Sequence, residues 1–240
     1  YGTYPGEFGV SRIHGSDGPC SMRAITSYKD RVYFFNEHGI CFYDGLRARP
    51  LGDEKLRYLL KNVSRNSLAL SCAARVGSKL YFAIAEKDCA NNNVVVEYDV
   101  DKKEYMIRRG MDVTCFLELD DELLFGGGDG YVYRYGDGRT YQGAQMQAYW
   151  KTPRMDLGAK HIKKYSTTMY THVSGEGKLK VEARFGGRTK SKEVELTDEM
   201  KPIRFRLRNK GRTVQFVFSN IAGSHFDMHA PQISIEADED

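Results

Sequence analysis

The sequence has few prolines, which interrupt helices and strands, and few cysteines, which cross-link a fold: 6 and 5 among 240 residues. It contains a single tryptophan. The cysteines are odd in number, widely spaced and without a CxxC pair, which argues against a disulfide framework or a zinc knuckle. No run approaches the roughly 18 apolar residues that span a bilayer, and the start lacks the order of a signal peptide. We therefore expect a soluble protein with no membrane partner and with reduced, partly buried thiols at Cys20, Cys41, Cys72, Cys89 and Cys115.

The residues that are abundant favour strands joined by tight turns. The chain contains 16 Tyr, 12 Phe and 24 Gly, and its apolar and charged fractions of 41% and 28% are those of a globular protein. Aromatic residues are enriched in strands, and glycines mark the turns between them. The composition therefore predicts an all-β fold.

A repeated aromatic hairpin organises the first 140 residues. The segments RVYFF, KLYFA and ELLFG are each followed by a second strand pattern, and their aligned residues Phe34, Phe82 and Phe125 are separated by 48 and 43 positions. This period is typical of the four-stranded blades of a β-propeller. Further strands are expected at 68–76, 104–109 and 113–119.

One short helix is expected between the first two repeats. In residues 53–63 the apolar side chains recur at helical spacing, so that one stripe can pack against a blade; they are Leu56, Leu59, Leu60 and Val63. Three blades are too few to close a ring. Because the chain starts at Tyr1 rather than at a methionine, we expect preceding blades in a longer protein, the alternative being an open partial propeller.

Residues 141–240 show stricter alternation and predict an antiparallel β-sandwich, so the expected domains are 1–140 and 141–240. A turn at Lys210 and Gly211 would pair Leu207 with Val214, Phe205 with Phe216, and Ile203 with Phe218, with three arginines facing away: Arg204, Arg206 and Arg208. A second turn at Gly186 and Gly187 would place Leu179 opposite Val194, Lys180 opposite Glu193, and Lys178 opposite Glu195.

Charge is distributed unevenly between the two parts. The formal net charge is +4, of which +5 belongs to residues 141–240 and −1 to the first 140. Such a modest excess is typical of a solvated surface, although the arginine row at 204, 206 and 208 can also bind an acidic partner. We do not expect nucleic acid to be a partner.

Three longer segments carry a resemblance to a known family. RAITSYKDRVYFFNEHGICFYDG and LLFGGGDGYVYRYGDG, followed by AYWKTPRMDLGAKHIKK, resemble phage and prophage virion proteins over most of the chain. In that family, propeller blades ending in a G-I-x-x-Y-D-G hairpin precede a β-sandwich, which is entered here through Trp150 to Gly158. The resemblance implies a tail, neck or baseplate component that acts through protein–protein contacts. The second and third repeats depart from the motif, with Val100 in place of the glycine and YGDG in place of YDG.

No segment carries a convincing catalytic or cofactor motif. GGGDG (126–130) lacks the GK[ST] of a phosphate loop and lies between two strands, so we expect a hairpin turn. DVDKKE (99–104) lacks the glycine and glutamate of a calcium loop and is read as a strand-end turn. His225, Asp227 and His229 share one face of a strand and could ligate a metal, but a polar outer face explains them as well.

The remaining histidines stand alone and are read as surface or satisfied residues: His14, His38, His161 and His172. No G-x-S-x-G motif occurs, and none of the cysteines lies in a signature context. We therefore expect no catalytic, cofactor-binding or metal-binding residues.

These observations predict a non-enzymatic structural component of a phage or prophage particle, made in the bacterial cytoplasm and carried in the virion. Its expected partners are other virion proteins and copies of itself. The alternative is a carbohydrate-binding propeller with an accessory sandwich, because exposed Tyr and Trp stack on sugars, which leaves a glycan as a further candidate ligand. A glycoside hydrolase ranks third, since no pair of carboxylates facing one sugar can be recognised from the sequence.

Overall fold

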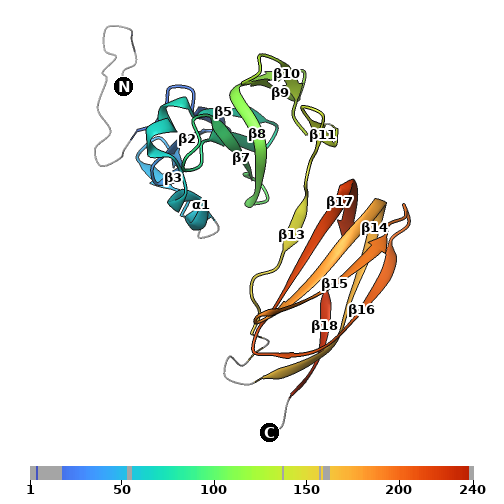
Figure 1. The fold of residues 1–240 in the computed structure, drawn as a ribbon. Coiled ribbons are helices and arrows are strands. Elements are labelled where there is room, and N and C mark those ends of the chain that lie inside the picture. Colours follow the sequence, from blue (N-terminus) through green and yellow to red (C-terminus); the bar gives the residue numbers. More distant parts are fainter. Residues whose placement is uncertain are drawn as a thin grey trace. The chain divides into compact units, whose positions relative to one another are not determined.

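The protein is described by a computed structural model that covers residue 4 and residues 18–52, 56–136, 138–156, 158 and 163–237. It is an all-β protein with antiparallel sheets, which confirms the predicted class (Figure 1). The chain forms two compact units, residues 1–137 and 138–240, whereas the sequence pattern suggested a boundary at 140. None of the helices formed by the described residues is long and apolar enough to cross a membrane.

The first repeat forms a four-stranded antiparallel sheet of its own. Its strands follow the order of the sequence and are β1 (Ile25–Tyr28), β2 (Arg31–Asn36), β3 (Gly39–Tyr43) and β4 (Ala48–Pro50). Phe34 on β2 is the register partner of Ile25 on β1 and of Cys41 on β3. The predicted hairpin of residues 31–43 is therefore the centre of this sheet.

The second and third repeats share one six-stranded sheet, which corrects the expectation of a separate sheet for each. Its strands are β5 (Cys72–Val76), β6 (Lys79–Ile84), β7 (Asn92–Asp99), β8 (Glu104–Leu119), β9 (Glu122–Gly127) and β10 (Val132–Arg134). The two strands expected at 104–109 and 113–119 are halves of β8. The first half pairs with β7 and the second with β9, and the register shifts between Val113 and Cys115.

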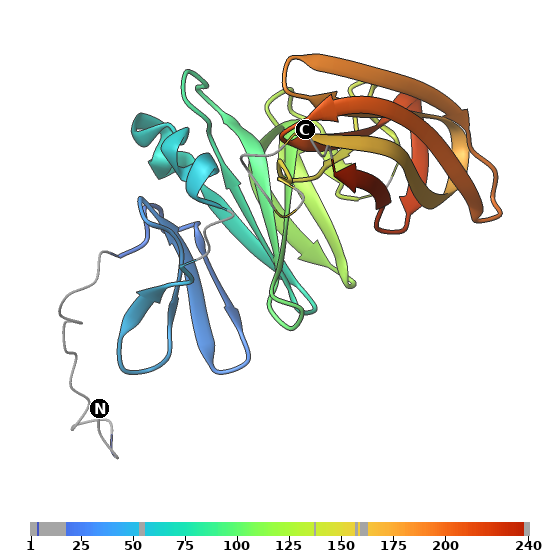
Figure 2. The same ribbon diagram turned by 90° about the horizontal axis from the view of Figure 1, so that it is seen from below.

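The bend in β8 nevertheless produces a propeller-like arrangement. Strand β5 lies beside β1 as well as beside β8, and Arg75 on β5 forms an ion pair of 3.7 Å with Glu118 in the second half of β8. We call β1–β4 blade 1, β5–β7 with residues 104–109 of β8 blade 2, and residues 113–119 of β8 with β9 and β10 blade 3. Their first strands thus lie side by side, as the inner strands of propeller blades do, and Figure 2 shows the sheets fanning out.

Apolar residues of the repeated hairpins hold the blades together. The rings of Phe35 in blade 1 and Phe82 in blade 2 lie 6.2 Å apart in one buried cluster. Tyr81 points the other way and contacts Tyr135, which follows β10, at 5.1 Å. Blade 2 is therefore buried on both faces, and five of the six residues of β6 are buried.

The predicted helix is confirmed as α1 (Arg57–Lys61), followed by the 3-10 helix η3 (Arg65–Leu70). Leu56 and Leu59 are buried in the core shared by blades 1 and 2, and Leu60 and Val63 pack against it. The strand expected at 68–76 begins only at Cys72, because its first residues belong to η3.

In the second unit, one long strand connects the layers of the sandwich. The strands are β11 (Thr140–Tyr141), β12 (Ala144–Gln145), β13 (Tyr149–Lys151), β14 (Lys164–Phe185), β15 (Arg188–Glu195), β16 (Lys201–Gly211), β17 (Val214–Met228) and β18 (Gln232–Ala237). The first half of β14 pairs with β16 and β18, and its second half with β15 and β17. Gly175 and Gly177 lie between these halves with φ of 136° and 86°.

One of the two predicted hairpins has the expected register and the other does not. Leu179 lies opposite Val194, which confirms the turn at residues 186 and 187. The predicted pairing of β16 with β17 is wrong, because Phe205 is the partner of Met169 and Phe216 is the partner of Ala183, both on β14. The faces were predicted correctly, since the residues expected to pair side by side are all in one core: Ile203, Phe205, Leu207, Val214, Phe216 and Phe218.

Candidate functional site: an arginine face on the sandwich

Alternation along β16 places three arginines on the outer face of the sandwich. Ile203, Phe205 and Leu207 are buried, and the residues between them and after them are exposed: Arg204, Arg206 and Arg208. The neighbouring strand β14 contributes Tyr170, which is 41% exposed and is the register partner of Arg204. The Arg204 guanidinium lies 5.6 Å from the centre of the Tyr170 ring. We call Arg204, Arg206, Arg208 and Tyr170 the arginine face.

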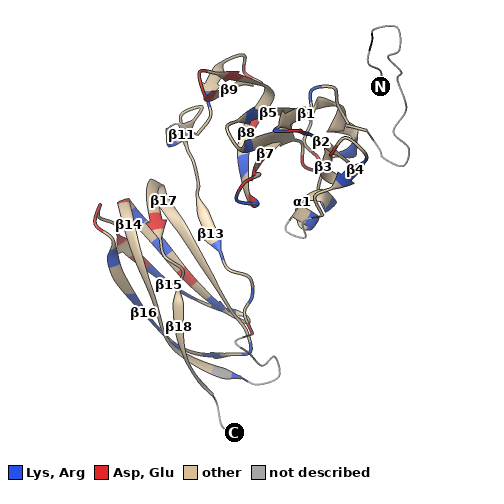
Figure 3. Ribbon diagram, turned by 180° about the vertical axis from the view of Figure 1, so that it is seen from behind, with Lys and Arg blue, Asp and Glu red and all other residues tan. Residues whose placement is uncertain are grey.

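Two lysines of β15 extend the positive charge beside this face. Lys190 donates a hydrogen bond of 3.1 Å to the carbonyl of Leu207, and Lys192 donates one of 3.2 Å to the carbonyl of Arg204. Among the described residues β16 pairs only with β14, so these lysines blunt an edge strand with charge. Residues 188–212 contain 9 Lys and Arg against 4 Asp and Glu, and Figure 3 shows the blue segments on β15 and β16.

The chemistry of the arginine face suits an acidic partner. A hollow of about 370 Å³ is lined by Ser191, Lys192, Arg204, Phe205 and Arg206. Guanidinium groups present a fork of donors that matches carboxylate or phosphate oxygens in pairs. Sequence analysis found the arginines but missed Tyr170 and the lysines, although the alternating basic residues 188, 190 and 192 were a visible signal.

On the neighbouring hairpin Lys180 lies opposite Glu193 and Lys178 opposite Glu195, as predicted, and the ion pairs of Glu182 run along its own strand. Glu182 on β14 contacts Lys180 at 2.8 Å and Arg184 at 2.7 Å. These two cations lower the pKa of the Glu182 carboxyl, chiefly through their hydrogen bonds. Lys180 thus finds its acidic partner two residues away in its own strand.

The histidine and aspartate set of β17 does not converge on one point. The imidazole of His225 lies 3.6 Å from the Asp227 carboxylate, and both side chains are largely exposed. His229 follows the strand and its ring lies 5.7 Å from that of His172 on β14. No group of three or more potential ligands that could hold a metal occurs in the described part of the chain. His14 and His161 lie outside the described residues.

The glycine-rich segment 126–130 forms the end of β9 and the start of the turn to β10. The Gly127 amide donates to the carbonyl of Tyr131 at 2.8 Å, and Asp129 accepts a hydrogen bond from the hydroxyl of Tyr133. A Cβ on Gly128 would meet the carboxylate of Asp112, so a larger residue there requires the Asp112 side chain to move. The segment thus leads into the predicted hairpin turn.

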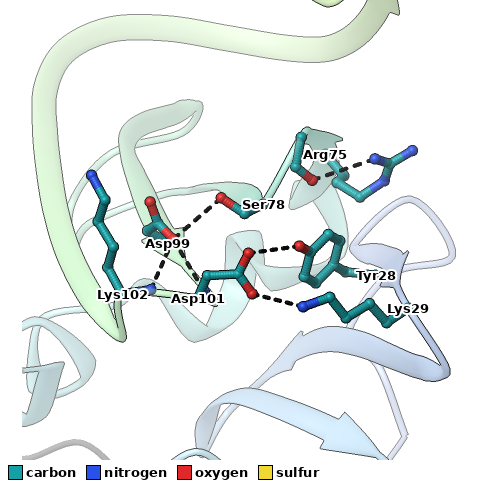
Figure 4. A network of polar contacts seen from close by, with 8 residues as sticks. Tyr28, Lys29, Arg75, Ser78, Asp99, Asp101 and Lys102 are labelled. Carbon is teal, nitrogen blue, oxygen red and sulfur yellow. Dashed lines mark hydrogen bonds and ion pairs between the residues drawn. The ribbon is translucent and has the colours of Figure 1, made fainter.

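The DVDKKE segment is also a turn, and it links blade 1 to blade 2. Asp99 accepts hydrogen bonds of 3.1 Å from the amides of Asp101 and Lys102. Asp101 in turn binds the Tyr28 hydroxyl at 2.8 Å and the Lys29 ammonium at 2.9 Å (Figure 4). The Lys29 hydrogen bond is the main cause of the lowered pKa of Asp101. Nothing in the sequence indicated this contact between turns more than 70 residues apart.

A second pocket lies beside the turns of blades 2 and 3. It encloses about 400 Å³, and its lining includes Tyr81, Tyr135, Asp121, Glu122 and Arg134. Burial raises the pKa of the Tyr135 phenol above its usual value. The pocket thus combines two phenols with carboxylates and a guanidinium.

Comparisons with known proteins leave the family open. No protein-family model matches the chain, and no curated protein matches it significantly. Among solved structures, the exo-β-1,3-galactanase of Phanerochaete chrysosporium bound to β-1,3-galactotriose is 8% identical, with 88% of this chain and 67% of that chain covered and a TM-score of 0.28. The same enzyme with galactose is 6% identical, with 85% and 65% covered and a TM-score of 0.26. Similarity at this level carries no inference about the present chain.

Proposed function

We propose that this chain is a non-enzymatic structural component of a phage or prophage particle, made in the bacterial cytoplasm and incorporated into the tail, neck or baseplate. The resemblance of residues 23–45, 123–138 and 148–164 to virion proteins supports this role. The order of the two units, propeller-like blades followed by a sandwich, is the order that the resemblance implies. The blades serve as a rigid platform, and the sandwich docks a neighbouring subunit.

The arginine face is the observation that carries the docking role. Three guanidinium groups on one exposed strand attract carboxylates, speed the encounter with an acidic surface and fix its orientation. Arg and Tyr are also among the residue types enriched at the energetic centres of protein interfaces. The proposed neighbour is therefore a virion protein that presents an acidic surface.

Mass spectrometry of gradient-purified particles tests the role. We expect peptides of this chain to co-purify with the particles in constant proportion to the other structural proteins. Their consistent absence from intact particles would refute the assignment.

The docking surface is tested by charge reversal in the same particles. We expect the double variant Arg204→Glu, Arg206→Glu to fold normally and to be incorporated at least tenfold less than the parent chain. The matched control reverses two exposed cations in the β7–β8 turn, Lys102→Glu and Lys103→Glu, and should be incorporated normally. Equal loss in both variants, or in neither, would contradict a docking role for the arginine face.

A second candidate function is carbohydrate binding, which the pocket with Tyr81 and Tyr135 favours. Phenol rings and carboxylates are groups that bind sugars by stacking and by hydrogen bonds to hydroxyls. A glycan array tests it, with Glu122→Gln as the variant that should lose any binding. Absence of binding on the array leaves this candidate without support.

A further inference from the structure

Blade 3 leaves one apolar face exposed to solvent. In its register, Leu117 on β8 lies opposite Leu124 on β9, and Cys115 lies opposite Gly126, which in turn faces Val132 on β10. Leu117, Leu119 and Val132 are 56%, 51% and 71% exposed. We call Leu117, Leu119, Leu124 and Val132 the open face of blade 3.

The exposure departs from the pattern set by blade 2. There, the residues that point to either side of β6 and β7 are buried, because blades 1 and 3 cover the two faces of blade 2. Blade 3 also has apolar residues on both sides of its strands. Only the face with Phe116 and Phe125 is covered, because these rings contact blade 2 and Tyr135. Its composition is thus that of a sheet with a neighbour on each side.

The repeat alignment shows which neighbour the open face accepts. Tyr33 packs in the core between blades 1 and 2, and its equivalent Tyr81 contacts blade 3, so this position faces the following blade. The equivalent in blade 3 is Leu124. Phe82 and Phe125, one position later, face the preceding blade. The open face therefore matches the preceding-blade side of another blade.

The outer face of blade 1 is such a side. It carries Phe34, the equivalent of Phe82 and Phe125, which is 6% exposed. Around it, the side chains of Ile25 and Val32 remain 37% and 38% exposed. Ile25 is the register partner of Phe34, and Val32 lies two residues before it on the same side of β2.

Charge favours a contact of blade 3 with blade 1 over a contact between two copies of blade 3. Residues 110–136, which include blade 3, contain one Arg and six Asp and Glu, a net charge of −5. Residues 18–52, which include blade 1, contain five Lys and Arg and three Asp and Glu, a net charge of +2. Blade 3 against blade 3 would oppose like charges, whereas blade 3 against blade 1 is attractive.

We infer that the open face of blade 3 binds the outer face of blade 1 of a second copy of this chain. Two copies joined head to tail make this contact twice and bring together six blades, a number within the range of closed propellers. The inference goes beyond the virion role and stands or falls independently of it.

Sedimentation equilibrium of the purified chain tests the inference. The parent chain should be a dimer, and higher salt should weaken it because the charges are screened. Leu117→Glu and Val32→Glu should each weaken dimerisation at least tenfold. Tyr58→Glu, on the exposed side of α1 and 74% exposed, is the control that should dimerise like the parent.

Mixing the two variants distinguishes head-to-tail pairing from other arrangements. A mixture of Leu117→Glu and Val32→Glu should regain a dimer, because one intact blade 3 can meet one intact blade 1. A monomeric parent chain, a Val32→Glu variant that dimerises normally, or two variants that both stay dimeric would each overturn the inference. Circular dichroism verifies folding, and Leu117→Gln and Val32→Thr replace any glutamate variant that unfolds.

Discussion

Gly175, between the two halves of β14, allows a sharp test of the described sandwich. Gly175 has a φ of +136°, and a Cβ built on it would lie 2.1 Å from the carbonyl oxygen of His225 on the paired strand β17. The clashing atoms belong to the backbone, so no side chain can move aside. Gly175→Ala must therefore either distort the backbone or separate the two strands.

The expected cost has two parts. A residue held in a sparsely populated backbone conformation costs about 1–3 kcal/mol, and forcing extra volume into a packed site costs about 1–3 kcal/mol more. We expect Gly175→Ala to lower the free energy of unfolding by about 4 kcal/mol. Gly186→Ala is the matched control, because its φ is also positive at +55° but nothing lies within 4 Å of the added Cβ. It should cost only about 1 kcal/mol.

Urea unfolding followed by tryptophan fluorescence measures both variants. The only tryptophan, Trp150, lies on β13 and its ring is 5.7 Å from that of Phe218, so its emission reports on the sandwich alone. Equal stability of the two variants would mean that β14 and β17 do not approach at Gly175, and the described path of β14 would be wrong.

Three further outcomes are expected. Phe82→Ala, at a fully buried position, should lower the stability of the first unit by about 3–5 kcal/mol in far-ultraviolet circular dichroism. Burial raises the pKa of Cys72 from 9.0 to about 12, so the unfolded thiol ionises first, stability should fall as the pH rises from 9 towards 12, and Cys72→Ala should reduce that fall in thermal melts. The pair Lys190→Ala, Lys192→Ala should increase aggregation in light scattering, because it uncovers the edge of β16.

Local patterns predicted those features that depend on residues close in sequence. The repeat of Tyr and Phe located the central hairpins, because alternation fixes which side chains are buried. The register of the turn at residues 186 and 187 was also predictable, since a two-residue turn sets the pairing of the strands it joins.

The neighbours of each strand were harder to predict. The pattern of Phe205 and Phe216 shows only that both side chains are buried. Pairing them in one hairpin buries both, and so does the observed arrangement, in which each pairs with a different part of β14. The continuous strand β8 was hard to predict for a similar reason. Residues 110–112 separate two strand patterns, and nothing in them shows that one strand runs through both. Alternation specifies a face, whereas the partner strand depends on the whole sheet.

The candidate surfaces were predictable to different degrees. The arginines of β16 were visible in the sequence, since their spacing of two places them on one face. The open face of blade 3 was not, because Leu117 has the pattern of a buried strand residue although it is 56% exposed. The link between Lys29 and Asp101 depends on blade packing and has no local signal.

The central claim is that the aromatic hairpins are successive blades, each packed against the next in the same direction. A double-mutant cycle on Phe35 and Phe82, whose rings lie 6.2 Å apart, measures this contact directly. We expect the two leucine substitutions to be coupled by about 0.5–1.5 kcal/mol in urea unfolding of the first unit. Strictly additive effects would show that blades 1 and 2 do not pack through these rings and would contradict the account.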